Sequence, residues 1–98
     1  MSIAVYTIDE IRGFVLPLLE KYGFEGASLF GSYARGDADE ESDIDILLKG
    51  REGFRPLDVF GVAESLHRVS GKQVDVFEVS ELDNGPFRDR VLGELVAL

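Results

Sequence analysis

Two short apolar runs, residues 27–30 and 43–49, constrain the fold more than any other feature of the chain. Both have the length of buried strands, and the second, DIDILLK, carries Asp43 and Asp45 among isoleucines and leucines. Successive side chains of a strand point to opposite faces, so the two aspartates face one way and the isoleucines face the other. The sequence therefore predicts a strand with one apolar face and one acidic face.

A third aspartate, Asp75, lies in a later apolar run, residues 73–79 (QVDVFEV). If the two runs form neighbouring strands, Asp43, Asp45 and Asp75 converge on one patch of the sheet. Three buried like charges would be costly without a cation among them. Two Mg²⁺ ions bridged by these carboxylates would neutralise the patch and would suit phosphoryl transfer. The three aspartates are therefore candidate metal ligands and catalytic residues.

A simpler interpretation of these aspartates is also open. Aspartates that alternate along a half-exposed strand are ordinary. A second Asp-x-Asp pair, Asp37 and Asp39, falls in a polar loop, so the pattern alone is weak evidence. The combination of the acidic pair, the third aspartate and an upstream Gly-Ser dipeptide favours a functional site.

Gly31 and Ser32 form this dipeptide, at the end of the first apolar run. Glycine has no Cβ, so the backbone can approach a ligand closely. The N–H groups at the start of a following helix favour anions, phosphates especially, and the serine hydroxyl adds a donor. Taken alone, Ser32 is more simply the N-cap of a short helix over residues 33–35, with Gly36 as its stop.

The other patterns predict an α/β (α+β) fold, a small mixed β-sheet with helices packed on one face. Thr7 and Glu10 have the spacing of a capping box before a helix that Gly23 ends. A second long helix begins at Pro56 and ends before Gly71, and its expected apolar stripe is Leu57, Phe60, Val62, Ala63, Leu66 and Val69. The last expected elements are a helix over 86–92 and a strand over 94–98.

The composition limits the classes of function. The 98 residues show no break in composition, which predicts a single domain over residues 1–98. The formal net charge of −9 argues against direct nucleic acid binding and permits a basic partner or bound cations. No apolar run approaches the roughly 20 residues of a membrane span, so we expect a cytoplasmic protein that binds no membrane.

The spacing of Gly31 and Ser32, then ten residues, then Asp43-Ile44-Asp45 resembles the signature of the nucleotidyltransferase superfamily typified by DNA polymerase beta. The intervening Ala34-Arg35-Gly36 and Ser42 resemble its minimal nucleotidyltransferase branch, called MNT. The likeness extends from the first helix through Asp75 to residues 82–91. It implies the polymerase-beta-like nucleotidyltransferase fold for nearly the whole chain.

The resemblance also implies a role for each matching residue. Gly31 and Ser32 would hold the β- and γ-phosphates of a nucleoside triphosphate. Asp43 and Asp45 would ligate two Mg²⁺ ions, while Asp75 would ligate the catalytic ion and help to deprotonate the attacking hydroxyl. The transferred group would be AMP from ATP, with pyrophosphate as the leaving group.

Arg35 has two open interpretations. It could contact a phosphate, or it could brace the loop by pairing with Asp37, Asp39 or Glu41. We expect the structural role. We likewise expect Tyr33 to be a partly packed helix residue and His67 to have a structural role.

The acceptor is constrained only by the resemblance. Many MNT proteins resemble antitoxins that transfer AMP to a tyrosine of a HEPN-type toxin, so we expect a toxin of this kind as partner. Two alternatives stay open, a binding module that neutralises a basic partner by occlusion and an enzyme that transfers the nucleotide to a small molecule. Assembly into a homo-oligomer is also open.

Overall fold

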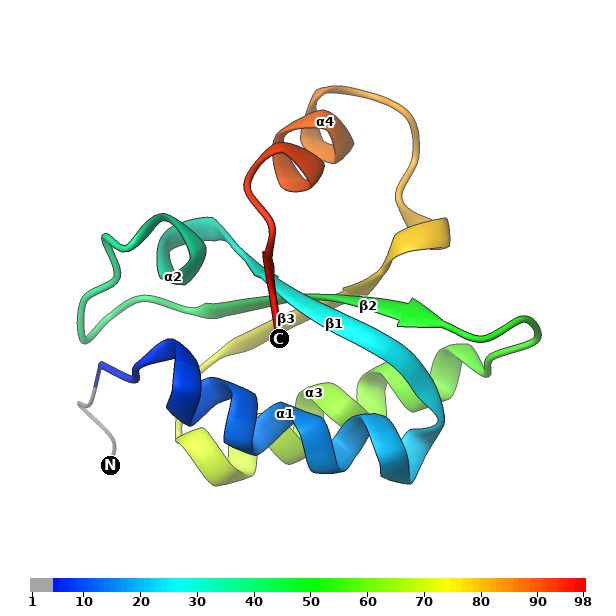
Figure 1. Ribbon diagram of the computed structural model, residues 1–98, viewed down its shortest axis with the longest axis horizontal. Coiled ribbons are helices and arrows are strands. Elements are labelled where there is room, and N and C mark those ends of the chain that lie inside the picture. Colours follow the sequence, from blue (N-terminus) through cyan, green and yellow to red (C-terminus); the bar gives the residue numbers. More distant parts are fainter. Residues whose placement is uncertain (1–4) are drawn as a thin grey trace.

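The computed structural model describes residues 5–98. These residues form one four-stranded sheet in the order β3-β2-β1-β4, together with four α-helices and a short 3₁₀ helix (Figure 1). In chain order the elements are α1 (Ile8–Tyr22), β1 (Phe24–Phe30), α2 (Gly31–Arg35), β2 (Ile44–Gly50), α3 (Pro56–Ser70), β3 (Val74–Glu78), η1 (Val79–Glu81), α4 (Pro86–Gly93) and β4 (Val96–Ala97).

The sheet is mixed, as the sequence predicts. β1 pairs antiparallel with both β2 and β4. β2 and β3 run parallel, because α3 carries the chain back between them. Because the two strands run parallel, the ends of β2 and β3 that carry aspartates lie side by side at the same end of the sheet.

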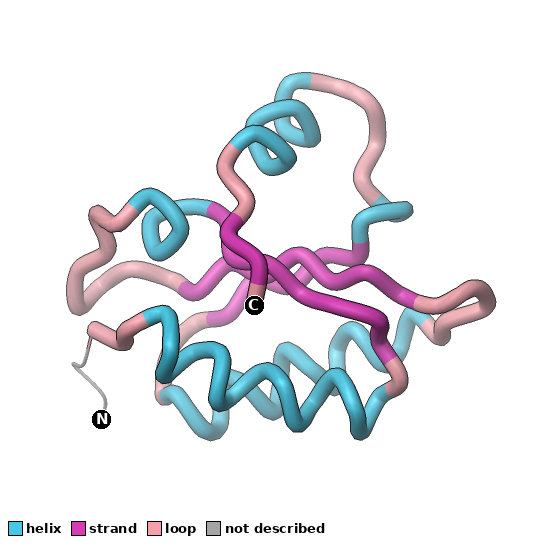
Figure 2. The backbone as a smooth tube through the Cα atoms, in the orientation of Figure 1, coloured by secondary structure: helices cyan, strands magenta, loops and turns pink. Residues whose placement is uncertain are grey.

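Helices α1 and α3 cover one face of the sheet (Figure 2). Between them lies the main core, to which β2 contributes Ile44, Ile46 and Leu48, each almost fully buried. α4 lies on the opposite side of the sheet, where Val91 packs with Phe30 and Leu47 in a second, smaller cluster. The prediction of helices on one face therefore describes α1 and α3, and α4 adds a partial second layer.

The sequence signals at the ends of the long helices are confirmed. The Thr7 hydroxyl accepts a hydrogen bond from the Glu10 N–H at 3.0 Å, and the Glu10 carboxylate accepts one from the Thr7 N–H at 2.9 Å. Gly23 ends α1, and Gly71 ends α3, each in the left-handed conformation. None of the helices within residues 5–98 is long and apolar enough to cross a membrane.

The predicted apolar stripe of α3 is partly wrong. Val62 and Leu66 are buried as expected, together with Val59. Leu57, Phe60 and Val69 are instead exposed by 69%, 71% and 53%. The reason is angular: residues 59, 62 and 66 follow the three- and four-residue spacing of one face, and the exposed side chains lie outside it.

Two strands also differ from expectation by more than one residue at an end. β1 begins at Phe24, three residues before the predicted start at residue 27. β4 comprises only Val96 and Ala97 of the strand predicted over 94–98, because its pairing with β1 is limited to Ser28 and Leu29.

We predict that Leu48→Ala lowers the free energy of unfolding by about 2–5 kcal/mol, because it leaves a cavity under β2. The matched control is Leu57→Ala on the exposed face of α3, which should cost less than about 1 kcal/mol. Urea denaturation of both variants measures the difference. Equal losses would contradict the assignment of these two leucines to core and surface.

Candidate functional site

Asp45 and Asp75 lie side by side on the sheet. They are register partners in the parallel pair of β2 and β3, so their side chains leave the same face of adjacent strands. Both are half-buried, and the exposed Asp43 lies one residue before β2. All three aspartates line one pocket of about 430 Å³. The predicted convergence of the three carboxylates is confirmed.

The pocket has a polar and an apolar part. Gly31, Ser32, Arg35 and Glu94 line it together with the three aspartates. Its apolar part comprises Phe30, Phe77 and Phe87, whose ring centroids lie 5.6–6.3 Å apart, and Arg90 lies over the Phe87 ring. Sequence reasoning missed the role of these aromatic residues, since their convergence depends on where α4 packs.

In the protein without a bound cation, the carboxylates repel one another. Burial raises the pKa of Asp45 to about 6, and the negative charges of Asp75 and Asp43 and a hydrogen bond with Asp75 add to the increase. Arg35 acts in the opposite direction and lowers this pKa. The site therefore disfavours the ionised form of Asp45 and would gain from a nearby cation.

The chemistry of the three pocket carboxylates suits a magnesium ion. Three carboxylates in one pocket are the hard oxygen ligands that Mg²⁺ prefers. Within residues 5–98, however, no three acidic or histidine side chains lie close enough together in this conformation to coordinate one metal ion.

Gly31 sits against Asp45, and its conformation requires glycine. Its φ is +73°, and a Cβ at this position would collide with the Asp45 carboxylate. The Gly31 N–H donates to Glu94 Oε1 at 3.0 Å. Gly31 therefore shapes the site by lacking a side chain, while its own N–H is engaged within the protein.

Ser32 lines the pocket but is not the predicted N-cap. α2 begins at Gly31, with Phe30 as the cap residue, and no side chain caps the helix. Ser32 consequently lies inside the first turn of α2, where it lines the pocket.

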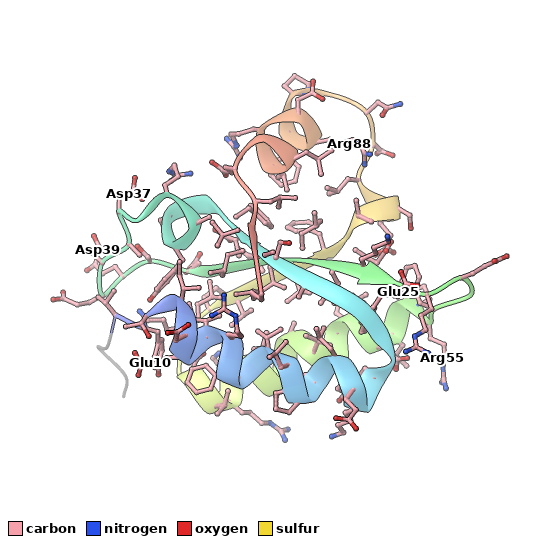
Figure 3. The ribbon with its side chains drawn as sticks, viewed as in Figure 1. Glu10, Glu25, Asp37, Asp39, Arg55 and Arg88 are labelled. Atoms are coloured by element: carbon pink, nitrogen blue, oxygen red, sulfur yellow. The ribbon has the colours of Figure 1, made fainter. Side chains whose placement is uncertain are left out.

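Arg35 pairs with Asp37 in the loop, as expected, and it also pairs with Glu94, which the sequence did not suggest. Its guanidinium donates to Asp37 at 3.3 Å and to Glu94 at 3.1 Å. Hydrogen bonds with Glu94 and Asp37 raise the pKa of Arg35. Figure 3 shows Asp37 and Asp39 pointing outward from the loop between α2 and β2. Glu94 was missed because no local pattern reveals which strand its segment joins.

The structural roles predicted for Tyr33 and His67 agree with the structure, although His67 is exposed and acts through a hydrogen bond. Tyr33 is buried in the main core, and His67 Nδ1 bonds to the Lys72 carbonyl oxygen at 2.7 Å. The buried Lys72 ammonium donates to the Glu40 carbonyl oxygen at 2.8 Å and so anchors the acidic loop before Asp43.

The sequence model of the family "Polymerase beta, Nucleotidyltransferase" matches residues 15–98. A proposed protein adenylyltransferase of Methanocaldococcus jannaschii is 43% identical over 91% of this chain and 95% of its own length. The protein adenylyltransferase MntA of Thermococcus cleftensis is 35% identical over 95% of this chain and 97% of its own length. The chain therefore belongs to the polymerase beta nucleotidyltransferase family and is a nucleotidyltransferase.

Solved structures agree on the fold. A proposed minimal nucleotidyltransferase superposes with a TM-score of 0.77 at 32% identity, over 97% of this chain and 99% of that one. The tri-AMPylated HEPN toxin of Shewanella oneidensis in complex with an MNT antitoxin gives a match with a TM-score of 0.64 at 18% identity, over 91% of this chain and 66% of that one. The second likeness concerns the fold alone.

We predict that Asp45→Asn stabilises the metal-free protein at about pH 7.5 and has no such effect below about pH 4. Below pH 3.8, the ordinary pKa of the carboxyl, Asp45 is protonated in both the folded and the unfolded chain. Above about pH 6, near its pKa in the folded protein, Asp45 is ionised in both states, and its charge destabilises the folded state. After allowance for solvent screening of a half-exposed group, the gain is about 1 kcal/mol.

Urea denaturation in EDTA across this pH range measures the gain. The exposed Asp83 provides a control, Asp83→Asn, which should change stability little at any pH. A stabilisation by Asp45→Asn that is independent of pH would contradict the raised pKa.

Proposed function

We propose that this chain is an Mg²⁺-dependent protein adenylyltransferase that transfers AMP from ATP to a tyrosine hydroxyl of a partner protein. The observation that carries the proposal is the register pairing of Asp45 with Asp75 in one pocket with Gly31 and Ser32. Relatives of nearly the same length, 35–43% identical, are described as protein adenylyltransferases, one of them as a proposed one.

In the proposed reaction the acceptor oxygen attacks the α-phosphorus of ATP. A new P–O bond forms to the acceptor, the bond between the α-phosphorus and the oxygen of the β-phosphate breaks, and pyrophosphate leaves. The acceptor proton goes to a carboxylate oxygen of Asp75, the catalytic residue on the edge strand β3. Such a reaction depends on positioning and on compensation of charge, so it requires no covalent nucleophile from the protein.

The other pocket residues divide the remaining tasks. Asp43, Asp45 and Asp75 would hold two Mg²⁺ ions, which when bound would offset the charge of the triphosphate and of the leaving group. Ser32 and Arg35 supply donors for the β- and γ-phosphates. Two of the five N–H donors of Arg35 are used in its bonds to Asp37 and Glu94, so the guanidinium can also contact a phosphate oxygen.

The proposed acceptor is a HEPN-type toxin, for which this chain would act as antitoxin. An AMPylated HEPN toxin is the partner of the MNT antitoxin in the Shewanella oneidensis complex. A net charge of −9 suits a basic protein surface. Phe77 and Phe87, exposed by 37% and 43%, offer an apolar rim beside the carboxylates for such a partner.

We predict that Asp45→Asn abolishes AMP transfer while the protein stays folded, because the variant loses a carboxylate of the site and relieves like-charge repulsion. Intact-mass measurement of the co-expressed partner, with and without added Mg²⁺ and ATP, detects the transferred AMP. Undiminished transfer by this variant would overturn the proposed metal site.

The same experiment separates catalysis from occlusion. If this chain neutralises its partner equally with and without ATP and the partner gains no AMP mass, the protein acts as a binding module. Transfer to a small molecule in the absence of protein modification would identify a different acceptor.

We predict that Gly31→Ala reduces AMP transfer by about ten-fold or more, since the added methyl group displaces the Asp45 carboxylate. Gly36→Ala is the matched control, because Gly36 has a similar φ of +85° but open space around the added atom. Both variants should lose about 1 kcal/mol of stability from the left-handed backbone. Equal transfer rates for the two would show that the contact with Asp45 is unimportant.

A further inference from the structure

Glu94 connects the end of the chain to the rim of the pocket. It follows α4 directly, and its carboxylate makes two bonds to α2, one from the Gly31 N–H at 3.0 Å and one from the Arg35 guanidinium at 3.1 Å. The Glu94 side chain is 17% exposed, compared with 63% for Asp37, the other partner of Arg35. Glu94 therefore makes two bonds from a mostly buried, inner position, whereas Asp37 contacts Arg35 from an exposed, outer position.

The position of Glu94 follows from the sheet register. β4 pairs antiparallel with β1 through Leu29 and Val96. Continued beyond the two strands, this register sets Glu94, two residues before Val96, opposite Gly31, two residues after Leu29, and a hydrogen bond joins them. The short strand β4 therefore places an anionic side chain beside the turn that leads into α2.

We propose that Glu94 is a positioning residue, which holds the Gly31–Ser32 turn and Arg35 in the geometry that receives the triphosphate. This inference rests on the proposed function. Glu94 accepts the Gly31 N–H, which fixes the glycine in its left-handed conformation next to Asp45. The turn then presents Ser32 to the pocket, and the second oxygen of Glu94 keeps Arg35 at the pocket wall. Glu94 itself does not contact the reacting atoms.

A competing role can be stated for the same contact. The Glu94 carboxylate occupies donors that a phosphate could use, so it could act as a plug that nucleotide must displace. The positioning role predicts weaker nucleotide binding when Glu94 is removed, and the plug predicts tighter binding. The sign of the change therefore decides between them.

The test uses Glu94→Ala and Glu94→Gln, with Asp37→Asn as the matched control. The alanine variant loses both bonds, the glutamine variant keeps an acceptor for the Gly31 N–H, and the control removes only the outer carboxylate on Arg35. Binding of AMP-PNP with Mg²⁺ and the steady-state constants for ATP are measured for each.

For Glu94→Ala we expect the dissociation constant for AMP-PNP and the KM for ATP to rise about ten-fold or more, with a smaller change in kcat. Glu94→Gln should stay within about three-fold of the wild-type protein, and Asp37→Asn should not differ from it. Unchanged or tighter binding by a folded Glu94→Ala protein would overturn the inference.

Hydrogen exchange of the Gly31 amide, followed by NMR without nucleotide, provides an independent measurement. We expect protection in the wild-type, Glu94→Gln and Asp37→Asn proteins, and exchange about ten-fold faster or more in Glu94→Ala. Equal protection in all four would overturn the inference. A wild-type protein that binds no AMP-PNP would instead overturn the proposed function, and the amide measurement would still test Glu94.

Discussion

The parallel pairing of β2 with β3 is the constraint on which the site depends. It sets Asp45 directly beside Asp75, an arrangement that like-charge repulsion opposes. Burial raises the pKa of Asp45 to about 6, and the charge of Asp75 adds to this increase. Apolar burial on the opposite face of β2 offsets this repulsion, because Ile44 and Ile46 are almost fully buried beneath α1 and α3. One strand therefore stabilises the fold on one side and concentrates negative charge on the other.

The second element of the site is the turn from β1 into α2. Gly31 permits a close approach to Asp45 that any side chain would prevent. Glu94 and Arg35 form an ion pair at the rim of the pocket and so place one positive charge beside the aspartates. α4 and β4, although short, determine where Phe87 and Glu94 lie in the pocket. The C-terminal part of the chain thus completes a site whose acidic residues come from the central sheet.

Much of the fold could be predicted because its signals are local. The capping box at Thr7, the glycines that end both long helices and the alternation in β2 each act within a few residues. The errors arose where packing decides. Leu57 and Phe60 matched a helical pattern but lie outside the buried stripe of α3, and Ser32 lies inside α2 instead of capping it. Propensity and spacing alone do not show which face of a helix meets the sheet.

By itself the sequence determined the residue types of the site, their alternation along β2 and their spacing from Gly31 and Ser32, because strand geometry fixes which neighbouring side chains share a face. Only the tertiary structure decided that β3 lies beside β2 in the register that pairs Asp75 with Asp45, and that β4 brings Glu94 opposite Gly31. Strand order and register arise from contacts between residues far apart in the chain. The free energy of those contacts depends on the whole core, so no local segment encodes them.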